Sequence, residues 1–219
     1  LVQELDYFCL LKEVFGVRRW VDDAVFRPGP TMSSRRFYCA AVCAKGRVFV
    51  FGGVEGYALN TTEVLDAQTL AVTPGPDLLT GRDGCAAVQI DADRVLLLGG
   101  FGTVSECLST TEILHLPTLT VSPGPDSNAR SGCAAVALDS NRILVVGGYV
   151  GWPASNTGRT EVLSLDTMAF APGPAMAAPR SACAVVALDE HRFMVAGGYK
   201  RGCLNSTEIL DVRTMAFTP

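Results

Sequence analysis

Two charged residue types recur along this 219-residue chain at nearly constant spacing. The arginines are Arg36, Arg82, Arg130 and Arg180, and the glutamates are Glu63, Glu112, Glu161 and Glu208. Four guanidinium groups in a ring could bind an anion, whereas an arginine and a glutamate of the same repeat could form a buried ion pair. Both series are flanked by apolar sequence, and a buried charge without a partner costs several kcal/mol. We therefore predict a structural role for both series, with the anion-binding ring as the alternative.

Residues suited to metal or nucleophilic chemistry are sparse. The chain has only two histidines, His115 and His191, and neither stands beside a nucleophile motif or a second metal ligand. Four of the eight cysteines recur inside apolar runs, where free cysteine behaves as a small buried hydrophobe, as expected in a reducing compartment. We expect no catalytic residue, metal or cofactor. A glycosidase-type carboxylate pair stays open, because Asp and Glu are abundant.

The charged residues belong to a repeat of about 48 residues that occurs four times. In the third copy, short apolar runs at 133–138, 142–146, 160–165 and 168–171 have the length and composition of β-strands. A Gly-Gly pair follows the second run, and Pro-Gly-Pro at 172–174 forces a turn after the fourth. Four short antiparallel strands in each repeat are typical of a propeller blade.

The repeat resembles the kelch repeat in its Gly-Gly pair, in the Arg that opens the first strand and in the Glu of the third. The resemblance covers residues 28–219 and implies an all-β, kelch-type β-propeller, a partial ring of about four four-stranded blades. Within a domain at 22–219 we place the blades at about 31–76, 77–126, 127–174 and 175–219. The fourth-strand position that is usually Trp in kelch units holds Val72, Val121, Phe170 and Phe217. We expect an open arc whose end blades expose apolar faces.

Residues 1–21 do not fit the repeat. Leu1, Leu5, Phe8 and Leu11 are spaced one turn apart, which predicts a helical segment with one apolar face. The run from Glu4 to Phe8 resembles the closing helix of a BTB domain of the potassium-channel tetramerisation type. A helical cap or a degenerate half-blade is the alternative. The chain begins with Leu and shows no signal peptide, so we expect it to be part of a longer protein that is not secreted.

Candidate binding residues lie in the loops after the Gly-Gly pairs, where length varies and aromatic residues gather. They are Tyr57, Phe101, Tyr149, Trp152, Tyr199, Lys200 and Arg201. Exposed aromatic and Arg side chains on a rigid scaffold are typical of protein-binding surfaces. The alternative is that these residues only pack on each other.

These features together predict a non-catalytic scaffold that binds a partner protein through its propeller loops. The BTB resemblance implies a substrate adaptor of a cullin-type ubiquitin ligase, cytoplasmic or nuclear, with a homo-oligomer or a cullin held by the BTB part. The alternative is a carbohydrate-active or galactose-oxidase-like enzyme whose catalytic residues lie outside this chain. The net charge of −4 without a Lys/Arg stripe argues against nucleic acid, and the short apolar runs argue against a membrane span.

Overall fold

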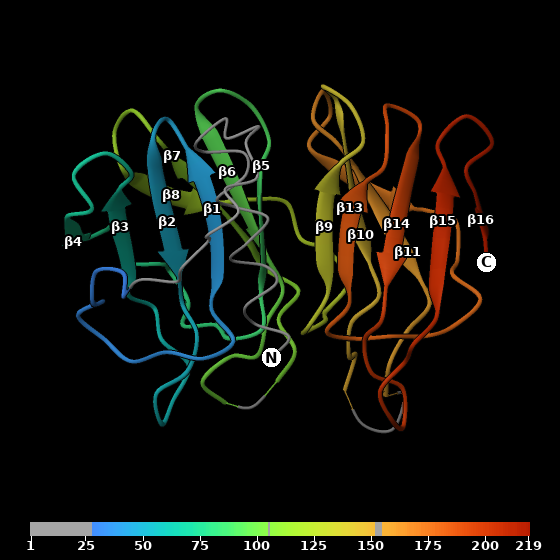
Figure 1. The fold of residues 1–219 in the computed structure, drawn as a ribbon, viewed down its shortest axis with the longest axis horizontal. Helices are drawn as coiled ribbons and strands as arrows, with labels where there is room; N and C mark the ends of the chain where they lie inside the picture. The colour runs from blue at the N-terminus through green and yellow to red at the C-terminus, as the bar shows by residue number, and fades with distance from the viewer. Residues whose placement is uncertain (1–27, 105, 152–154) are drawn as a thin grey trace, which may run out of the picture.

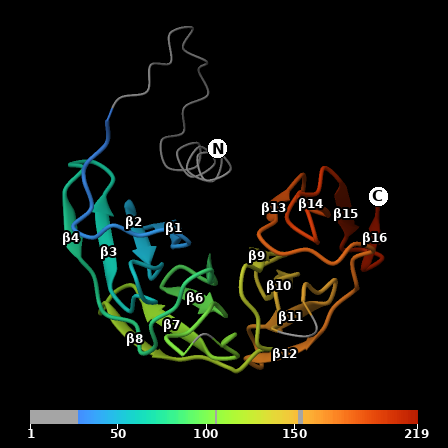
Figure 2. The ribbon, with the colours of Figure 1, turned by 90° about the horizontal axis from the view of Figure 1, so that it is seen from below.

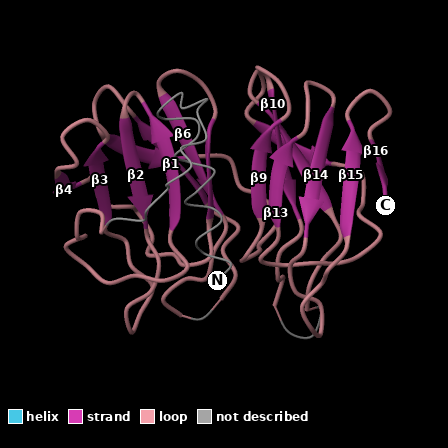
Figure 3. Ribbon diagram, viewed as in Figure 1, coloured by secondary structure: helices cyan, strands magenta, loops and turns pink. Residues whose placement is uncertain are grey.

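The computed structural model describes residues 28–104, 106–151 and 155–219 of the chain. These residues form sixteen strands arranged in four four-stranded antiparallel sheets, as Figure 1 shows. No helix occurs among them (Figure 3), and so none is long and apolar enough to cross a membrane. The predicted arc of four four-stranded blades is confirmed. The helical segment predicted at 1–21 lies outside the described residues, as does Trp152.

Each blade takes its four strands in sequence order from the centre of the arc to its rim. Blade 1 contains β1 (Ala40–Ala44), β2 (Arg47–Phe51), β3 (Thr62–Asp66) and β4 (Val72–Pro74). Blade 2 contains β5 (Ala86–Gln89), β6 (Arg94–Leu98), β7 (Thr111–His115) and β8 (Thr120–Pro123). Blade 3 contains β9 (Ala134–Ala137), β10 (Arg142–Val146), β11 (Thr160–Ser164) and β12 (Ala169–Pro172). Blade 4 contains β13 (Ala184–Ala187), β14 (Arg192–Ala196), β15 (Thr207–Asp211) and β16 (Ala216–Thr218).

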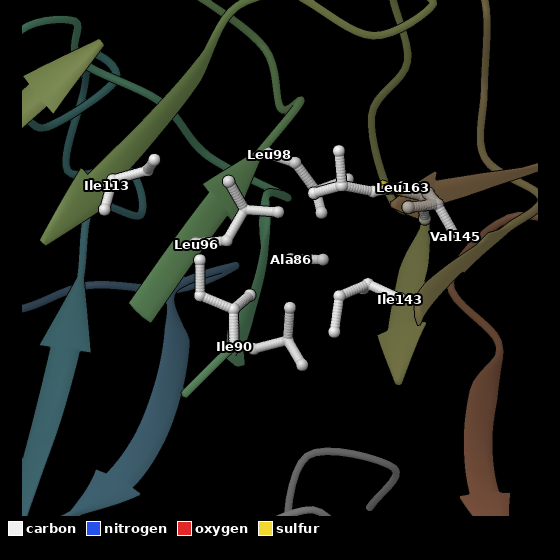
Figure 4. Packing of buried hydrophobic residues seen from close by; sticks show 10 residues of the cluster. Ala86, Ile90, Leu96, Leu98, Ile113, Ile143, Val145 and Leu163 are labelled. Carbon is white, nitrogen blue, oxygen red and sulfur yellow. The ribbon is translucent and has the colours of Figure 1, made fainter. Parts of the chain in front are cut away.

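The second strand of each inner blade is apolar on both faces because a blade lies on either side of it. In β6, Val95 and Leu97 pack with residues of blade 1, whereas Leu96 and Leu98 pack with residues of blade 3. Successive side chains of a strand point to opposite faces, so a continuous apolar run supplies both contacts. Figure 4 shows the cluster between blades 2 and 3, where Leu98 approaches Val145 and Leu163.

The Gly-Gly pairs are required by the contact between blades. Gly99 follows β6 with a φ of 63°, a conformation that favours glycine. A Cβ atom added to Gly99 would lie 2.4 Å from the carbonyl oxygen of Arg130, in the loop that leads to the next blade. The following glycine, Gly100, donates its N–H to that same carbonyl at 2.8 Å. The pair therefore lets one blade approach the next closely enough for a backbone hydrogen bond.

A second series of hydrogen bonds links the blades just before their innermost strands. Ala182 N–H donates to Gly132 O at 2.7 Å, Gly132 N–H to Gly84 O at 2.7 Å, and Gly84 N–H to Tyr38 O at 2.8 Å. All four residues have φ between 49° and 62°. The same backbone conformation at one position in each blade thus joins all four blades.

The arc is open, because blade 1 and blade 4 do not meet (Figure 2). The face of blade 1 that has no neighbouring blade carries Val48 and Val50, which are half-buried, whereas the corresponding Val95 and Leu97 of blade 2 are fully buried. The open face of blade 4 exposes Val186. The prediction that the end blades expose apolar faces is confirmed.

The apolar residue of each fourth strand contacts the junction with the preceding blade, where a preceding blade is present. Val121, Phe170 and Phe217 each pack against the cluster that joins their blade to the preceding one. Val72 is half-buried like the other three, but it lies on the open face of blade 1, which has no preceding blade. Apolar residues other than Trp therefore fill the junctions between these blades.

Candidate protein-binding loop face

The loops after the Gly-Gly pairs and the loops between blades emerge at the same end of the propeller (Figure 1), and Figure 2 views the molecule from that end. We call this end the loop face, formed by residues 28–38, 53–61, 75–84, 100–110, 124–132, 148–159, 173–182 and 198–206, without the undescribed ones. Short backbone bridges connect its two kinds of loop. Phe101, for example, pairs with Asp83 on one side and with Cys107 on the other. The opposite end, formed by the hairpin turns, is the turn face.

A buried ion pair fixes the loop face to each blade. In blade 2, Arg82 Nη2 lies 2.5 Å from Glu112 Oε1, and Arg82 Nη1 donates to carbonyl oxygens just after β6 and just before β7. The carboxylate of Glu112 also accepts the backbone N–H groups of Leu79 and Thr80 at 2.8 and 3.0 Å. Glu112 therefore ties the loop arriving from blade 1 to the third strand of blade 2.

The same arrangement occurs in all four blades. The pairs are Arg36–Glu63 at 2.8 Å, Arg82–Glu112 at 2.5 Å, Arg130–Glu161 at 2.5 Å and Arg180–Glu208 at 2.9 Å. The arginine side chains are at most 1% exposed, which leaves no accessible guanidinium for the anion-binding ring that we considered as an alternative. Burial raises the pKa of Glu63, but the N–H groups of Ser33 and Ser34 and the Arg36 side chain outweigh it and lower that pKa below its usual value.

The predicted binding residues differ in exposure. Phe101 and Tyr149 are half-buried and stack on each other with ring centroids 5.9 Å apart, so part of the set does pack internally. Tyr57 and Tyr199 are 67% and 51% exposed. Lys200 and Arg201, next to Tyr199, are exposed as well. The exposed members form the part of the set that a partner can reach, and their binding role stays a prediction.

Exposed apolar side chains are concentrated on the loop face. Of the ten large hydrophobic residues that are exposed among the described residues, seven lie there. They are Met32, Phe37, Tyr38, Tyr57, Leu79, Val104 and Tyr199. Sequence reasoning missed Met32, Phe37, Tyr38, Leu79 and Val104, because it considered only the loops after the Gly-Gly pairs and their aromatic or basic residues.

One further residue was missed, the carboxylate of Asp83. It directly follows the buried Arg82 and precedes Gly84, in the row of residues that links the blades. Partial burial raises the pKa of Asp83, and its carboxylate has no hydrogen bond or ion pair among the described residues. The sequence does locate this position, because it directly follows the repeated arginine. Its residue is Phe37, Asp83, Ser131 or Ser181, so the repeat predicts no charge there and only blade 2 carries one.

The turn face offers little catalytic chemistry within the described residues. His115 Nε2 lies 2.9 Å from Ser122 Oγ, yet no carboxylate there bonds to the other ring nitrogen, as a Ser-His-Asp arrangement requires. No group of three or more His, Cys, Asp or Glu side chains in the described parts of the chain could hold a metal ion. No disulfide bond joins any two of the seven cysteines in the described residues.

Comparison with known proteins gives a family match for one of the four blades. Residues 35–79, which contain blade 1, match the family model of the Kelch motif. A search of curated protein sequences gives no match. Blades 2, 3 and 4 repeat the strand order, the Gly-Gly pair and the buried Arg–Glu pair of the matched blade.

Proposed function

We propose that this chain, a four-blade kelch-repeat β-propeller, is a non-catalytic scaffold that binds a partner protein through its loop face. The kelch propeller is commonly a protein-interaction fold. The observation that carries the proposal is the distribution of exposed apolar side chains, of which seven in ten lie on the loop face within the described residues. Apolar side chains gathered on one face of a protein are typical of an interaction site.

The rigidity of the backbone beneath these side chains supports the same function. The buried Arg–Glu pairs hold the loops between blades, as Glu112 does for Leu79. Leu79 itself is exposed, one residue from Thr80, whose N–H is also fixed. A side chain held in place before binding loses less conformational entropy when the partner arrives. Binding residues on a rigid scaffold therefore suit selective recognition.

The adaptor role is a finer proposal. It depends on residues 1–21, which resemble the end of a BTB domain but lie outside the described residues. A cullin-type ligase subunit that copurifies with the protein, and is lost when residues 1–21 are deleted, would support it. The oxidase or carbohydrate-active alternative depends on catalytic residues outside this chain.

Affinity capture with matched variants tests the scaffold function. The loop-face variant combines Tyr57→Ala, Tyr199→Ala and Arg201→Ala, all at exposed positions. Its control carries three exposed turn-face changes, Lys45→Ala, Arg192→Ala and Arg213→Ala. We expect at least one protein that quantitative mass spectrometry finds with the wild-type chain and the control to fall at least tenfold with the loop-face variant, because hot-spot side chains each contribute about 2 kcal/mol. If every captured protein stays with the loop-face variant, the assignment of the binding surface is wrong.

A further inference from the structure

Charges of opposite sign predominate in different halves of the loop face. The acidic half comprises five exposed or half-buried carboxylates in the loops of blades 1 and 2 and the loop leaving blade 2, namely Glu55, Asp77, Asp83, Glu106 and Asp126, and one exposed cation, Arg35, before blade 1. The basic half comprises Arg159, Lys200 and Arg201, in the loops of blades 3 and 4. The loops at 148–159, 173–182 and 198–206 contain no Asp or Glu. The accessible charge of the loop face is therefore mainly negative over blades 1 and 2 and positive over blades 3 and 4.

The charges of the turn face, by contrast, are largely paired. Its ion pairs are Lys45–Asp93, Arg94–Asp91, Arg142–Asp139, Arg192–Asp189 and Arg213–Asp211. None of the nine charged side chains in the two halves of the loop face forms an ion pair or a side-chain hydrogen bond within the described residues. Unpaired charges on a single face remain available to a partner.

Asp83 is the most constrained charge of the acidic half. Its backbone is fixed on both sides, because Asp83 N–H donates to Phe101 O at 3.1 Å and Phe101 N–H donates to Asp83 O at 2.7 Å. The residue is half-buried, so its carboxylate has lost part of its hydration without gaining a partner. A cation placed beside it would replace that lost hydration. Asp83 is therefore the natural contact for a Lys or Arg side chain of the partner.

An aromatic row connects the two halves. Phe101 of blade 2 stacks on Tyr149 of blade 3, at the border between negative and positive loops. Tyr199, at the same position in blade 4, is exposed beside Lys200 and Arg201. Aromatic rings at this border offer apolar contact between the two charged ends.

We infer that the loop face recognises an extended segment of the partner protein whose two ends carry opposite charge. The basic end lies over Asp83 and the loops of blades 1 and 2, and the acidic end lies against Lys200 and Arg201 of blade 4. Apolar side chains between the ends contact the row of Phe101, Tyr149 and Tyr199. The inference rests on the proposed function and adds the chemistry of the partner. A nucleic acid, which is anionic throughout, would meet repulsion over the acidic half.

An unbiased peptide selection tests the inference. The probe is a phage-displayed library of random 16-residue peptides, selected on the whole chain at low salt. We expect enriched peptides to carry Lys or Arg in one half and Asp or Glu in the other, always in the same order. Affinity of the most enriched peptide is then measured by fluorescence anisotropy against Asp83→Asn and against Lys200→Gln combined with Arg201→Gln.

The variants have matched controls on the turn face. Asp83→Asn is compared with Asp93→Asn, and the double basic variant is compared with Lys45→Gln combined with Arg213→Gln. We expect Asp83→Asn to weaken binding about tenfold, as for a partly desolvated ion pair, and the double basic variant to weaken it about threefold, as for exposed pairs. Replacing the basic residues of the peptide by Gln should abolish the effect of Asp83→Asn. The controls should stay within twofold of the wild type.

Three outcomes would overturn the inference. The first is enrichment of peptides with a single sign of charge or with none, the second is no enrichment at all, and the third is binding that Asp83→Asn leaves unchanged. The capture experiment uses whole proteins, and repeating it with only Tyr57→Ala and Tyr199→Ala, without Arg201→Ala, makes its result independent of these outcomes. A captured partner that depends on Tyr57 and Tyr199 but shows no dependence on charge would refute only the further inference. The absence of any captured partner would refute the proposed function as well.

Discussion

Replacing Glu112 by Gln in the buried pair of blade 2 should cost about 3–5 kcal/mol of unfolding free energy, the range measured when one partner of a buried pair is removed. Glu112 accepts a charge-assisted hydrogen bond from Arg82 and two backbone N–H bonds from Leu79 and Thr80. Gln keeps the shape but offers one acceptor oxygen in place of two. The guanidinium of Arg82, whose side chain is 0% exposed, then loses its counter-charge with no access to water.

The assay is urea unfolding of the variant beside a matched exposed pair. Asp139→Asn removes the charge from the Arg142–Asp139 pair, whose side chains are 38% and 40% exposed, and should cost at most about 1 kcal/mol. Total stabilities of about 5–15 kcal/mol make the difference between the two variants easy to resolve. Amide hydrogen exchange at residues 79 and 80 should accelerate only in Glu112→Gln.

A double variant keeps the test decisive if Glu112→Gln fails to fold. Arg82→Met combined with Glu112→Gln removes both charges, so no guanidinium is left without a partner. We expect this double variant to be destabilised by less than Glu112→Gln alone, so that it can be measured where the single variant does not fold. Equal costs for Glu112→Gln and Asp139→Asn would show that the buried pair does not hold the blade, and our account of the Arg and Glu series would be wrong.

Two further predictions concern the interior of the arc. Gly84→Ala should lower the free energy of unfolding, measured by thermal unfolding, by about 2–3 kcal/mol, because φ is 58° and a Cβ would lie 2.7 Å from a serine hydroxyl. The control Gly46→Ala, with φ of 70° and open space around the Cβ, should cost about 1 kcal/mol. Equal costs would contradict the close contact between blades at Gly84. Burial raises the pKa of the Cys85 and Cys133 thiols from 9.0 to about 12, so the stability that comes from their neutral form is complete below pH 9 and is lost as the pH rises toward 12. The free energy of unfolding should fall by about 1 kcal/mol per buried thiol at pH 10. Cys85→Ala should reduce this pH dependence, while Cys203→Ala, at an exposed thiol, should leave it unchanged. A wild-type stability that does not change with pH would refute the burial of these thiols.

Most of the fold was predictable from the sequence because the same pattern of strand and turn residues occurs four times. The strands expected at 142–146 and 160–165 occur as Arg142–Val146 and Thr160–Ser164. The first strand, expected at 133–138, is shorter at Ala134–Ala137. Such ends depend on hydrogen bonds of individual residues, which apolar composition does not specify.

The candidate binding surface was predictable only in part. Tyr57 and Tyr199 are exposed, as a binding role requires, whereas the rings of Phe101 and Tyr149 stack on each other and are partly buried by that contact. Whether an aromatic residue after Gly-Gly reaches solvent depends on its neighbour in the next blade, some 48 residues away along the chain. Local sequence contains no information about that neighbour until the register between blades is known.

The sequence by itself determined the number of described blades, their strand order and the apolar character of both faces of each second strand, because these features follow from a repeated pattern of side chains and turn residues. Only the tertiary structure decided that the loop charges are mainly negative in one half of a single face and positive in the other, and that Asp83 stays unpaired beside a buried Arg–Glu pair. Stacking the blades brings loops distant in the chain onto one surface and removes water from some of their charged groups. Pairing and hydration are properties of that surface, which no single repeat contains.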